Sequence, residues 1–300
     1  MRVFITGATG FIGSQITAKL LSAGHEVLGL TRSVRGVAAL EAAGAAAHRG
    51  DIDDLDSLRA GAADSDAVIH TAFDHDFSRY AANCEKDRRA IAALGEALGR
   101  GARPLIITSV TGIGSSAPGE PAAEGHLDLA HPIPRVASEQ AGEALKAEGV
   151  NVITVRLPQV HDTVRQGLIS PFIDIARAKG VSAYLGAGAN RFSAAHVSDV
   201  ARLYRLALEG GHRNARYHAV AEEGVTLRAI AEVLGAGLGV PVVSIPEHEA
   251  GDHFGYMAPF AGLDLIASSA WTRDQLGWTP EGPDLLSDLR AMEYTPLQAG

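Results

Sequence analysis

A strand, three evenly spaced glycines and a helix open the chain, and this stretch constrains the fold more than any other part of the sequence. Residues 2–6, RVFIT, form a β-branched and aromatic run that predicts a buried strand. Gly7, Gly10 and Gly13 follow, ahead of a helix expected to reach about residue 23. They allow a tight turn, let backbone N–H groups approach a pyrophosphate and bring the helix close to the strand. The helix N-terminus adds partial positive charge, so the stretch predicts a dinucleotide site rather than a glycine turn without a ligand.

The end of the second predicted strand, residues 25–30, indicates which dinucleotide is preferred. An acidic residue about 20 positions past the glycines holds the adenosine ribose 2′-hydroxyl, whereas arginine accommodates a 2′-phosphate. Here Arg32, Ser33 and Arg35 follow the strand, and no carboxylate stands at its tip. We therefore expect NADP(H) to be preferred over NAD(H), with Arg32 making charge-assisted contacts to the phosphate. A solvated surface arginine is the alternative.

Apolar runs alternate regularly with amphipathic stretches as far as residue 157, after which the pattern loosens. The clearest predicted strands are residues 2–6, 25–30, 67–71, 104–109, 151–156 and 217–220. An Ala-rich helix is predicted over residues 37–47, ahead of a short third strand. Strands that alternate with helices imply a parallel sheet with right-handed crossovers, so the predicted fold class is α/β.

The composition excludes several classes of protein. The 300 residues suffice for a large core, and the net charge of −9 argues against nucleic acid as a partner, since phosphate binding needs a basic surface. Cys84 is the sole cysteine, so we expect no internal disulfide, which fits a reducing compartment. No apolar run approaches the roughly 20 residues of a membrane helix, and the chain begins directly on a predicted strand, which leaves no room for a signal peptide. We therefore expect a cytoplasmic protein with no membrane partner.

Motifs along nearly the whole chain resemble those of the extended short-chain dehydrogenase/reductase superfamily, in its NAD-dependent epimerase/dehydratase-like form. The motifs are TGATGFIG at 6–13, GDIDD at 50–54, VIHTA at 68–72, TSVTGIG at 108–114, RLPQVH at 156–161, FSAAHVSDVARLY at 192–204, TLRAIAEVLG at 226–235 and TRDQLGWTP at 272–280. The resemblance implies a Rossmann-type doubly wound parallel sheet with a smaller, discontinuous C-terminal substrate domain. The dinucleotide-binding domain is expected over 1–156 and 194–221, and the substrate domain over 157–193 and 222–300. The expected cofactor contacts are Gly7, Thr9, Gly10, Phe11, Ile12, Gly13, Arg32, Ser33, Arg35, Asp51, Ile52, Thr71, Ala72, Glu139 and Leu157.

The chain departs from the family pattern at the catalytic pair. The family carries Tyr-x-x-Ser-Lys on the helix after the fifth strand, where this chain reads Arg135-Val136-Ala137-Ser138-Glu139. This places it among the atypical members, which keep the cofactor site and lack the usual pair. Arginine cannot act as the proton donor but can stabilise an oxyanion. Glu139 is expected to accept hydrogen bonds from ribose hydroxyls; alternatively, it pairs with Arg135 along the helix.

Other side chains must then supply the remaining chemistry. Ser109 matches the family's catalytic Ser/Thr and is expected to hydrogen-bond a substrate carbonyl, the alternative being a serine that merely ends a strand. Histidine suits proton transfer near neutral pH, which makes His131 and His161 the candidate donors. The candidate substrate contacts are Thr111, Tyr184, His196 and His253. Residues 74–76, Asp-His-Asp, look like a metal triplet, but no fourth ligand is evident, so we expect no metal.

These observations leave three functions open. The first is an NADPH-dependent oxidoreductase that reduces a C=O or C=N bond of a small organic molecule. The second is a catalytically inactive NADP(H)-binding sensor, which the missing catalytic pair favours. The third is an epimerase or dehydratase of nucleotide sugars. The resemblance also implies a homodimer, formed by the helices expected near 77–100 and 134–149.

Overall fold

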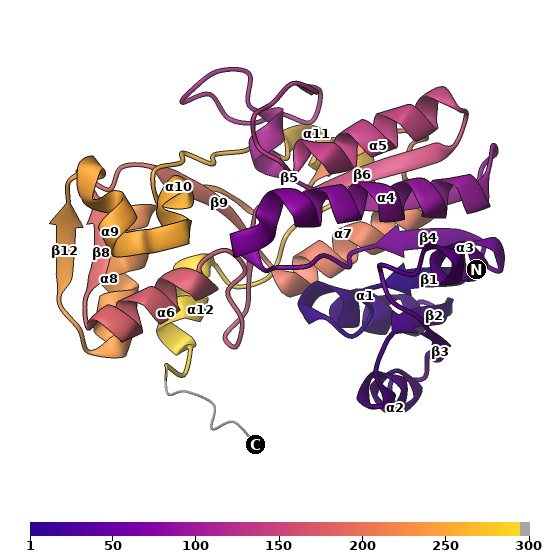
Figure 1. Ribbon diagram of the computed structural model, residues 1–300, viewed down its shortest axis with the longest axis horizontal. Helices are drawn as coiled ribbons and strands as arrows, with labels where there is room; N and C mark the ends of the chain where they lie inside the picture. Colours follow the sequence, from indigo (N-terminus) through magenta and orange to yellow (C-terminus); the bar gives the residue numbers. More distant parts are fainter. Residues whose placement is uncertain (295–300) are drawn as a thin grey trace.

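The computed structural model describes residues 1–294, and a seven-stranded sheet forms its larger part (Figure 1). Its strands are β1 (Arg2–Thr6), β2 (Glu26–Thr31), β3 (Ala46–Arg49), β4 (Ala67–His70), β5 (Pro104–Val110), β6 (Asn151–Leu157) and β10 (Arg216–His218). They lie in the order β10-β6-β5-β4-β1-β2-β3, and each neighbouring pair is parallel. The order reverses between β1 and β4, which is the switch point of a doubly wound sheet. The predicted α/β class with a Rossmann-type sheet is therefore confirmed.

Helices cover both faces of the sheet, because alternate side chains of each strand point to opposite faces. One face carries α1 (Phe11–Ser22), α2 (Val34–Ala42) and α7 (Val197–Gly210). The other face carries α3 (Leu55–Ala63), α4 (Tyr80–Leu98) and α5 (Val136–Ala147). In β1, Val3 and Ile5 pack into the first layer and Phe4 into the second, and all three are fully buried. No helix within residues 1–294 combines the length and hydropathy that crossing a bilayer requires.

The second helix starts and ends earlier than the sequence indicates. It spans Val34–Ala42 instead of residues 37–47. The Oγ of Ser33 accepts a hydrogen bond from the backbone N–H of Gly36 at 3.0 Å, which caps the helix before its first turn. Gly44, with a φ of +86°, lies just after the helix and turns the chain toward β3.

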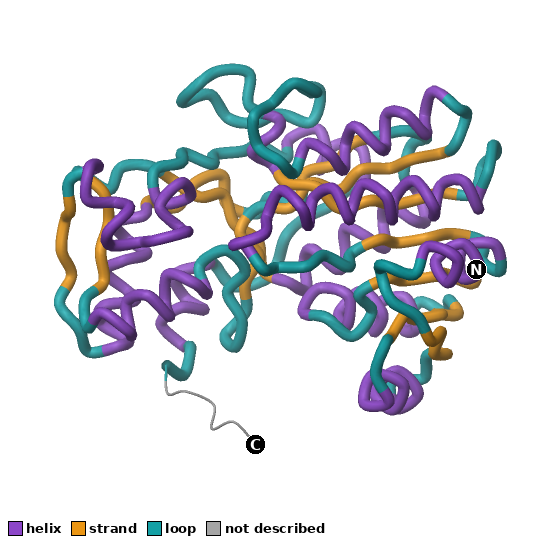
Figure 2. The backbone as a smooth tube through the Cα atoms, viewed as in Figure 1, coloured by secondary structure: helices purple, strands orange, loops and turns teal. Residues whose placement is uncertain are grey.

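A smaller layer of short strands and helices follows β6 and β10 (Figures 1 and 2). Its strands are β7 (Gln159–His161), β8 (Ser182–Leu185), β9 (Arg191–His196), β11 (Glu222–Thr226) and β12 (Val242–Ile245), paired as β11-β9-β7 and β12-β8. Its helices are α6 (Ser170–Lys179), α8 (Leu227–Leu238), α9 (Ala250–Phe254), α10 (Ala258–Ala261) and α12 (Leu285–Ala291), whereas α11 (Ala270–Leu276) packs against β10 and α7 of the larger part. Figure 2 shows the β12–β8 pair at the end of the molecule opposite the N-terminus. The domain boundaries given above stay a prediction.

The last strand of the large sheet, β10, is tied to the smaller layer by a buried neutral histidine. The Nδ1 of His218 lies 2.8 Å from the carbonyl oxygen of Ser268, and its Nε2 lies 3.3 Å from an Arg156 guanidinium nitrogen. The ring therefore donates on one side and accepts on the other, which only the neutral form can do. Burial, and then the Arg156 charge, lower the pKa of His218 to about 3.

This arrangement predicts a loss of stability in mild acid. Unfolded His218 binds a proton below about pH 6.5, whereas the folded form stays neutral, so stability falls as the pH drops. From pH 7 to pH 5 this residue alone should cost about 2 kcal/mol of the free energy of unfolding. Urea unfolding at the two pH values measures it. His218→Gln should shrink the difference by that amount, and the exposed His248→Gln should leave it unchanged; equal pH dependence in both variants would contradict the assignment.

Candidate functional site

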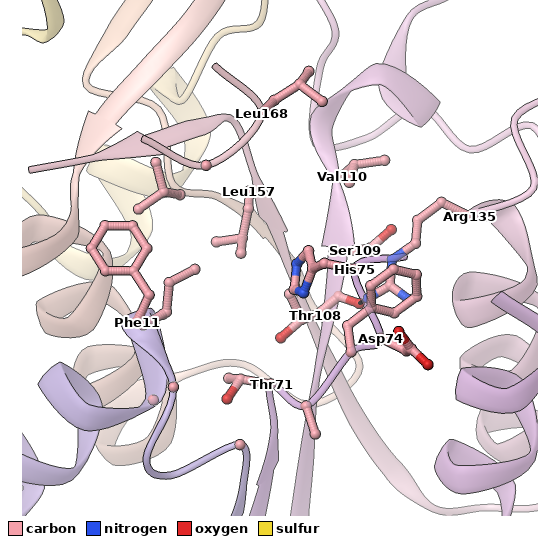
Figure 3. Close-up of a pocket in the computed structure, with 18 of the residues that line it drawn as sticks. Phe11, Thr71, Asp74, His75, Thr108, Ser109, Val110, Arg135, Leu157 and Leu168 are labelled. Carbon is pink, nitrogen blue, oxygen red and sulfur yellow. Dashed lines mark hydrogen bonds between the residues drawn. The ribbon is translucent and has the colours of Figure 1, made fainter. Parts of the chain in front are cut away.

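A cavity of about 800 Å³ lies beyond the carboxyl ends of the parallel strands (Figure 3). Open α/β sheets bind their ligands at this edge, next to the switch point. The glycine turn and the segments after β2 to β6 line it on the sheet side, and residues of the smaller layer line it on the other. The predicted site residues that line it are Gly7, Thr9, Gly10, Phe11, Ile12, Gly13, Arg32, Ser33, Asp51, Ile52, Thr71, Ala72, Ser109, Thr111, Arg135 and Leu157.

The glycine turn leaves room for a phosphate at the start of α1. Gly7 has a φ of +73°, and a Cβ there would lie 2.8 Å from the backbone nitrogen of Ala72. A Cβ on Gly13 would lie 2.0 Å from the carbonyl oxygen of Gly7, so this glycine sets how closely the helix packs. A Cβ on Gly10 would meet one atom, the carbonyl oxygen of Gly7 at 3.1 Å. The helix start has no side-chain cap and no acidic residue in its first turn, so its N–H groups are available to an anion.

The adenosine end of the cavity lies at the tip of β2. The Arg32 side chain is 82% exposed, and its Nη1 lies 3.6 Å from the Asp51 carboxylate. Ser33 lines the cavity while its oxygen caps α2. Arg35, by contrast, is exposed on the first turn of α2 and does not line the cavity. Of the three residues predicted to contact a 2′-phosphate, Arg32 and Ser33 line the cavity and Arg35 does not.

Glu139 is held in a buried ion network and does not line the cavity. Its carboxylate accepts hydrogen bonds from Arg156 at 2.6 and 3.0 Å, from Arg216 at 2.9 Å and from the Ser109 hydroxyl at 2.9 Å. Burial alone would raise the pKa of Glu139, but these partners outweigh it and lower the pKa, so the group stays ionised. The arginines thus take the position in which we expected a ribose, and the alternative pair with Arg135 does not form.

Arg135 pairs instead with Asp87 of α4. Its Nη1 lies 2.8 Å from the Asp87 carboxylate, and its Nη2 donates to the carbonyl oxygen of Thr108 at 3.0 Å. The guanidinium carbon stands 4.0 Å from the centre of the Phe73 ring, a cation–π contact. Arg135 is therefore a fixed cation in the cavity wall, able to stabilise a developing oxyanion but unable to release a proton.

Neither predicted proton donor lines the cavity. His131 precedes α5, and its Nδ1 accepts a hydrogen bond from the backbone N–H of Ile133 at 3.2 Å. His161 is fully buried on β7, with its Nδ1 2.7 Å from the Asp288 carboxylate of α12. Burial lowers the pKa of His161 although Asp288 opposes the shift. The contacts of both histidines are those of structural residues.

Three of the four predicted substrate contacts also lie elsewhere. The His196 ring caps α7 by accepting from the backbone N–H of Ser198. Tyr184 is on β8, with the Arg228 guanidinium 5.8 Å from its ring centre. His253 packs against Phe254 in α9. Thr111, the fourth, lines the cavity at the start of the short 3₁₀ helix η2 (Thr111–Gly114).

The segment between β4 and α4, residues 71–79, supplies cavity residues that the sequence analysis missed. Phe73, Asp74, His75 and Phe77 all line the cavity, the last at the start of the 3₁₀ helix η1 (Phe77–Arg79). The sequence does carry a sign of these cavity residues, because His75 lies between Phe73 and Phe77 shortly after a predicted strand. The sequence analysis considered residues 74–76 only as metal ligands. Within residues 1–294 no group of three or more His, Cys, Asp or Glu side chains is arranged to hold a metal.

Aromatic and aliphatic side chains from both layers line part of the cavity. The Phe260 ring of α10 lies 5.6 Å from Phe77 and 6.0 Å from Tyr80, between centroids. The aliphatic residues nearby are Val110, Ile133, Leu168, Leu263 and Leu265. We call these eight residues the apolar chamber.

Two cations that line the cavity near the apolar chamber are already paired with carboxylates. Lys86 lies 3.0 Å from Asp53 and 3.4 Å from Asp74, and Arg135 is bound to Asp87. Arg165, exposed at the rim, lines the cavity as well. The lining of the apolar chamber is therefore mainly apolar, and carboxylates neutralise most of the positive charge near it.

Comparison with known proteins shows what this chain is similar to. Residues 3–220 match the model of the NAD dependent epimerase/dehydratase family. The chain is 45% identical, over 98% of its length and 100% of the relative's, to an uncharacterized protein of Schizosaccharomyces pombe. It is 29% identical to a UDP-glucose 4-epimerase of Streptomyces lividans, over 98% of this chain and 95% of that one. The structure of a UDP-glucose 4-epimerase with UDP-glucose from Thermotoga maritima has the same fold, with a TM-score of 0.75 at 21% identity over 98% of this chain and 97% of that one.

The glycine geometry predicts different outcomes for two matched substitutions. Gly10→Val should stay folded, because its side chain would point into open cavity space, and it should weaken NADPH binding by at least roughly 100-fold, because it fills the path of the pyrophosphate. Gly13→Val should lower the free energy of unfolding by about 3 kcal/mol through its clash with Gly7. Thermal unfolding measures the stability of the two variants, and fluorescence titration measures their affinity for NADPH. A folded Gly10→Val protein with wild-type affinity would refute the phosphate site.

Proposed function

Because the chain belongs to the NAD dependent epimerase/dehydratase family, we propose that it is an NADPH-dependent reductase of a C=O or C=N bond in a small, largely apolar molecule. The observation that carries the proposal is the cavity, which connects the glycine turn to the apolar chamber. The residues fit a dinucleotide: the start of α1 is uncapped, and Gly10 leaves space in front of it. When bound, the nicotinamide supplies the hydride.

The chain's own residues bind the cofactor, orient the substrate and polarise its C=O or C=N bond. Backbone N–H groups after Gly10 hold the pyrophosphate, and Arg32 with Ser33 holds the 2′-phosphate. Leu157 and Thr71 lie on either side of the cavity near the strand ends (Figure 3). The Ser109 hydroxyl directs its hydrogen at Glu139, so polarisation of the acceptor group belongs mainly to the Arg135 cation.

A nucleotide-sugar epimerase or dehydratase is the second candidate, because the Streptomyces lividans relative is named UDP-glucose 4-epimerase. A nucleotide sugar brings a diphosphate, which needs free cations around it. Near the apolar chamber, Lys86 and Arg135 are bound to carboxylates, which leaves Arg165 as the one cation among the described residues there to face a diphosphate, and this weighs against the candidate. A dinucleotide-binding sensor without turnover is the outcome if no acceptor reacts. The homodimer stays a prediction, to be checked by light scattering, and so does the cytoplasmic location, to be checked by cell fractionation.

Cofactor preference is the first test. NADPH should bind more tightly than NADH, and Arg32→Ala should weaken NADPH binding by about 10- to 100-fold, because one or two charge-assisted hydrogen bonds are lost. Arg35→Ala should change little, since that side chain does not line the cavity. Calorimetric titration measures the dinucleotide affinities of the wild-type protein and of both variants. Equal affinity for the two dinucleotides, or an unchanged Arg32→Ala variant, would refute the preference.

Substrate class is the second test. Purified protein with NADPH should reduce members of a panel of aromatic and aliphatic aldehydes, ketones and imines, and it should not convert UDP-glucose. Phe260→Ala should raise the KM for aromatic acceptors about tenfold, because a ring of the apolar chamber is removed. Tyr256→Ala is the control, as its side chain is exposed outside the cavity. Turnover of UDP-glucose without reduction of any carbonyl would favour the epimerase.

A further inference from the structure

The proposed reductase needs a proton donor. Most of the polar side chains described around the cavity are unsuited to that role. Arg135 stays protonated at any ordinary pH, and Lys86 is fixed between two carboxylates. Burial raises the pKa of the Tyr80 phenol far above neutrality, which makes it a poor acid. The Ser109 hydroxyl is bound to Glu139. A histidine in the cavity would meet the requirement, since imidazole exchanges protons near neutral pH.

His75 is such a histidine. Its imidazole projects into the cavity (Figure 3), and its ring centre lies 5.3 Å from that of Phe73 and 6.2 Å from that of Phe77. The side chain is exposed because the cavity admits solvent, so water can exchange protons with it. Phe73 in turn lies under the Arg135 cation, which places the cation and the imidazole on the same wall.

The backbone on both sides of His75 is held in place. The side-chain amide of Asn83, itself buried, donates hydrogen bonds to the carbonyl oxygens of Asp74 at 3.2 Å and Asp76 at 3.0 Å. The Asp76 carboxylate accepts from the backbone N–H of Ser78 at 3.0 Å. A loop clamped on each side of one residue fixes the direction of that side chain, as a proton-transfer residue requires.

We propose that His75 is the residue that exchanges the proton with the substrate, a role that rests on the proposed reductase function. The bound dinucleotide would supply the hydride and its electron pair, so that one C–H bond of the nicotinamide breaks as a new C–H bond forms at the carbonyl carbon. The C=O π electrons move to oxygen, which takes the proton from the imidazolium of His75. Neutral imidazole then regains a proton from water, so NADPH, one proton and a carbonyl give NADP⁺ and an alcohol.

The groups that face His75 set the sign of the pH dependence. Although the ring is open to solvent on the cavity side, partial desolvation by the side chains around it, and then the Arg135 charge, lower the pKa of His75. A hydrogen bond to the Phe73 backbone, and then the neighbouring Asp74, itself paired with Lys86, oppose this shift. The donor is the imidazolium, so reduction should speed up as the pH falls through a pKa below 6.5. Oxidation of the alcohol should speed up as the pH rises through the same value.

His75→Gln provides the test, with 4-nitrobenzaldehyde as the probe acceptor. It should lower kcat roughly 10²- to 10⁴-fold, leave NADPH affinity unchanged and abolish the pH transition. His248→Gln is the matched control, because that side chain is 81% exposed and outside the cavity. Wild-type turnover retained in His75→Gln, or lost in His131→Gln instead, overturns the assignment. A wild-type protein that binds NADPH but reduces no acceptor in the panel overturns the reductase function and this role with it.

Proton NMR gives a readout that does not depend on turnover. The imidazole signal that disappears in His75→Gln identifies the residue. It should titrate below pH 6.5 and shift when NADP⁺ is added, because the ring stands in the same cavity. A signal that does not move at saturating NADP⁺ places His75 away from the cofactor and overturns the proposal.

Discussion

The carboxylate of Asp87 is fully buried, and the architecture of the cavity depends on the hydrogen bonds and the ion pair that stabilise this charge. It lies 3.0 Å from the Nε2 of His70 at the end of β4, accepts from Ser138 of α5 at 2.7 Å and is ion-paired with Arg135 at 2.8 Å. Burial alone would raise the pKa of Asp87, but Arg135 and the hydrogen bonds outweigh it and the pKa is lowered. One charge thus joins a strand and two helices, and it fixes the cation that packs on Phe73. The position of the 71–79 segment, and with it His75, follows from this pair.

Long apolar strands and the glycine turn could be predicted from the sequence, because their causes are local. The runs at 2–6, 104–109 and 151–156 match β1, β5 and β6 within a residue at each end. The helix predicted over 37–47 was wrong at both ends, because the Ser33 cap outweighed the run of alanines. The strands β8 and β12 of the smaller layer are four residues long and only partly buried, so their patterns carry little periodic signal.

The part of the site that the backbone of the glycine turn forms could be predicted from the sequence. The part that depends on contacts between side chains far apart in the sequence could not. Gly7, Gly10 and Gly13 line the cavity as their spacing indicates. Arg135 and Glu139 are four apart on one helix, where a pair is the simplest interpretation. Their partners come instead from α4, β6 and β10, and no local pattern reveals which strand end will supply an arginine. The same holds for the apolar chamber, whose rings meet only in the folded chain.

The Glu139 network also limits how this protein can change. Arg156 and Arg216 are buried or nearly so, and both are directed at position 139. A lysine there would place a third cation beside two guanidiniums and leave Glu143, 3.1 Å from Arg216, as the carboxylate bound to them, which a low-dielectric interior tolerates poorly. A tyrosine–lysine pair introduced at positions 135 and 139 alone would therefore leave Arg156 without its carboxylate partner. The charge at position 139 therefore changes without loss of stability only together with the two arginines that are directed at it.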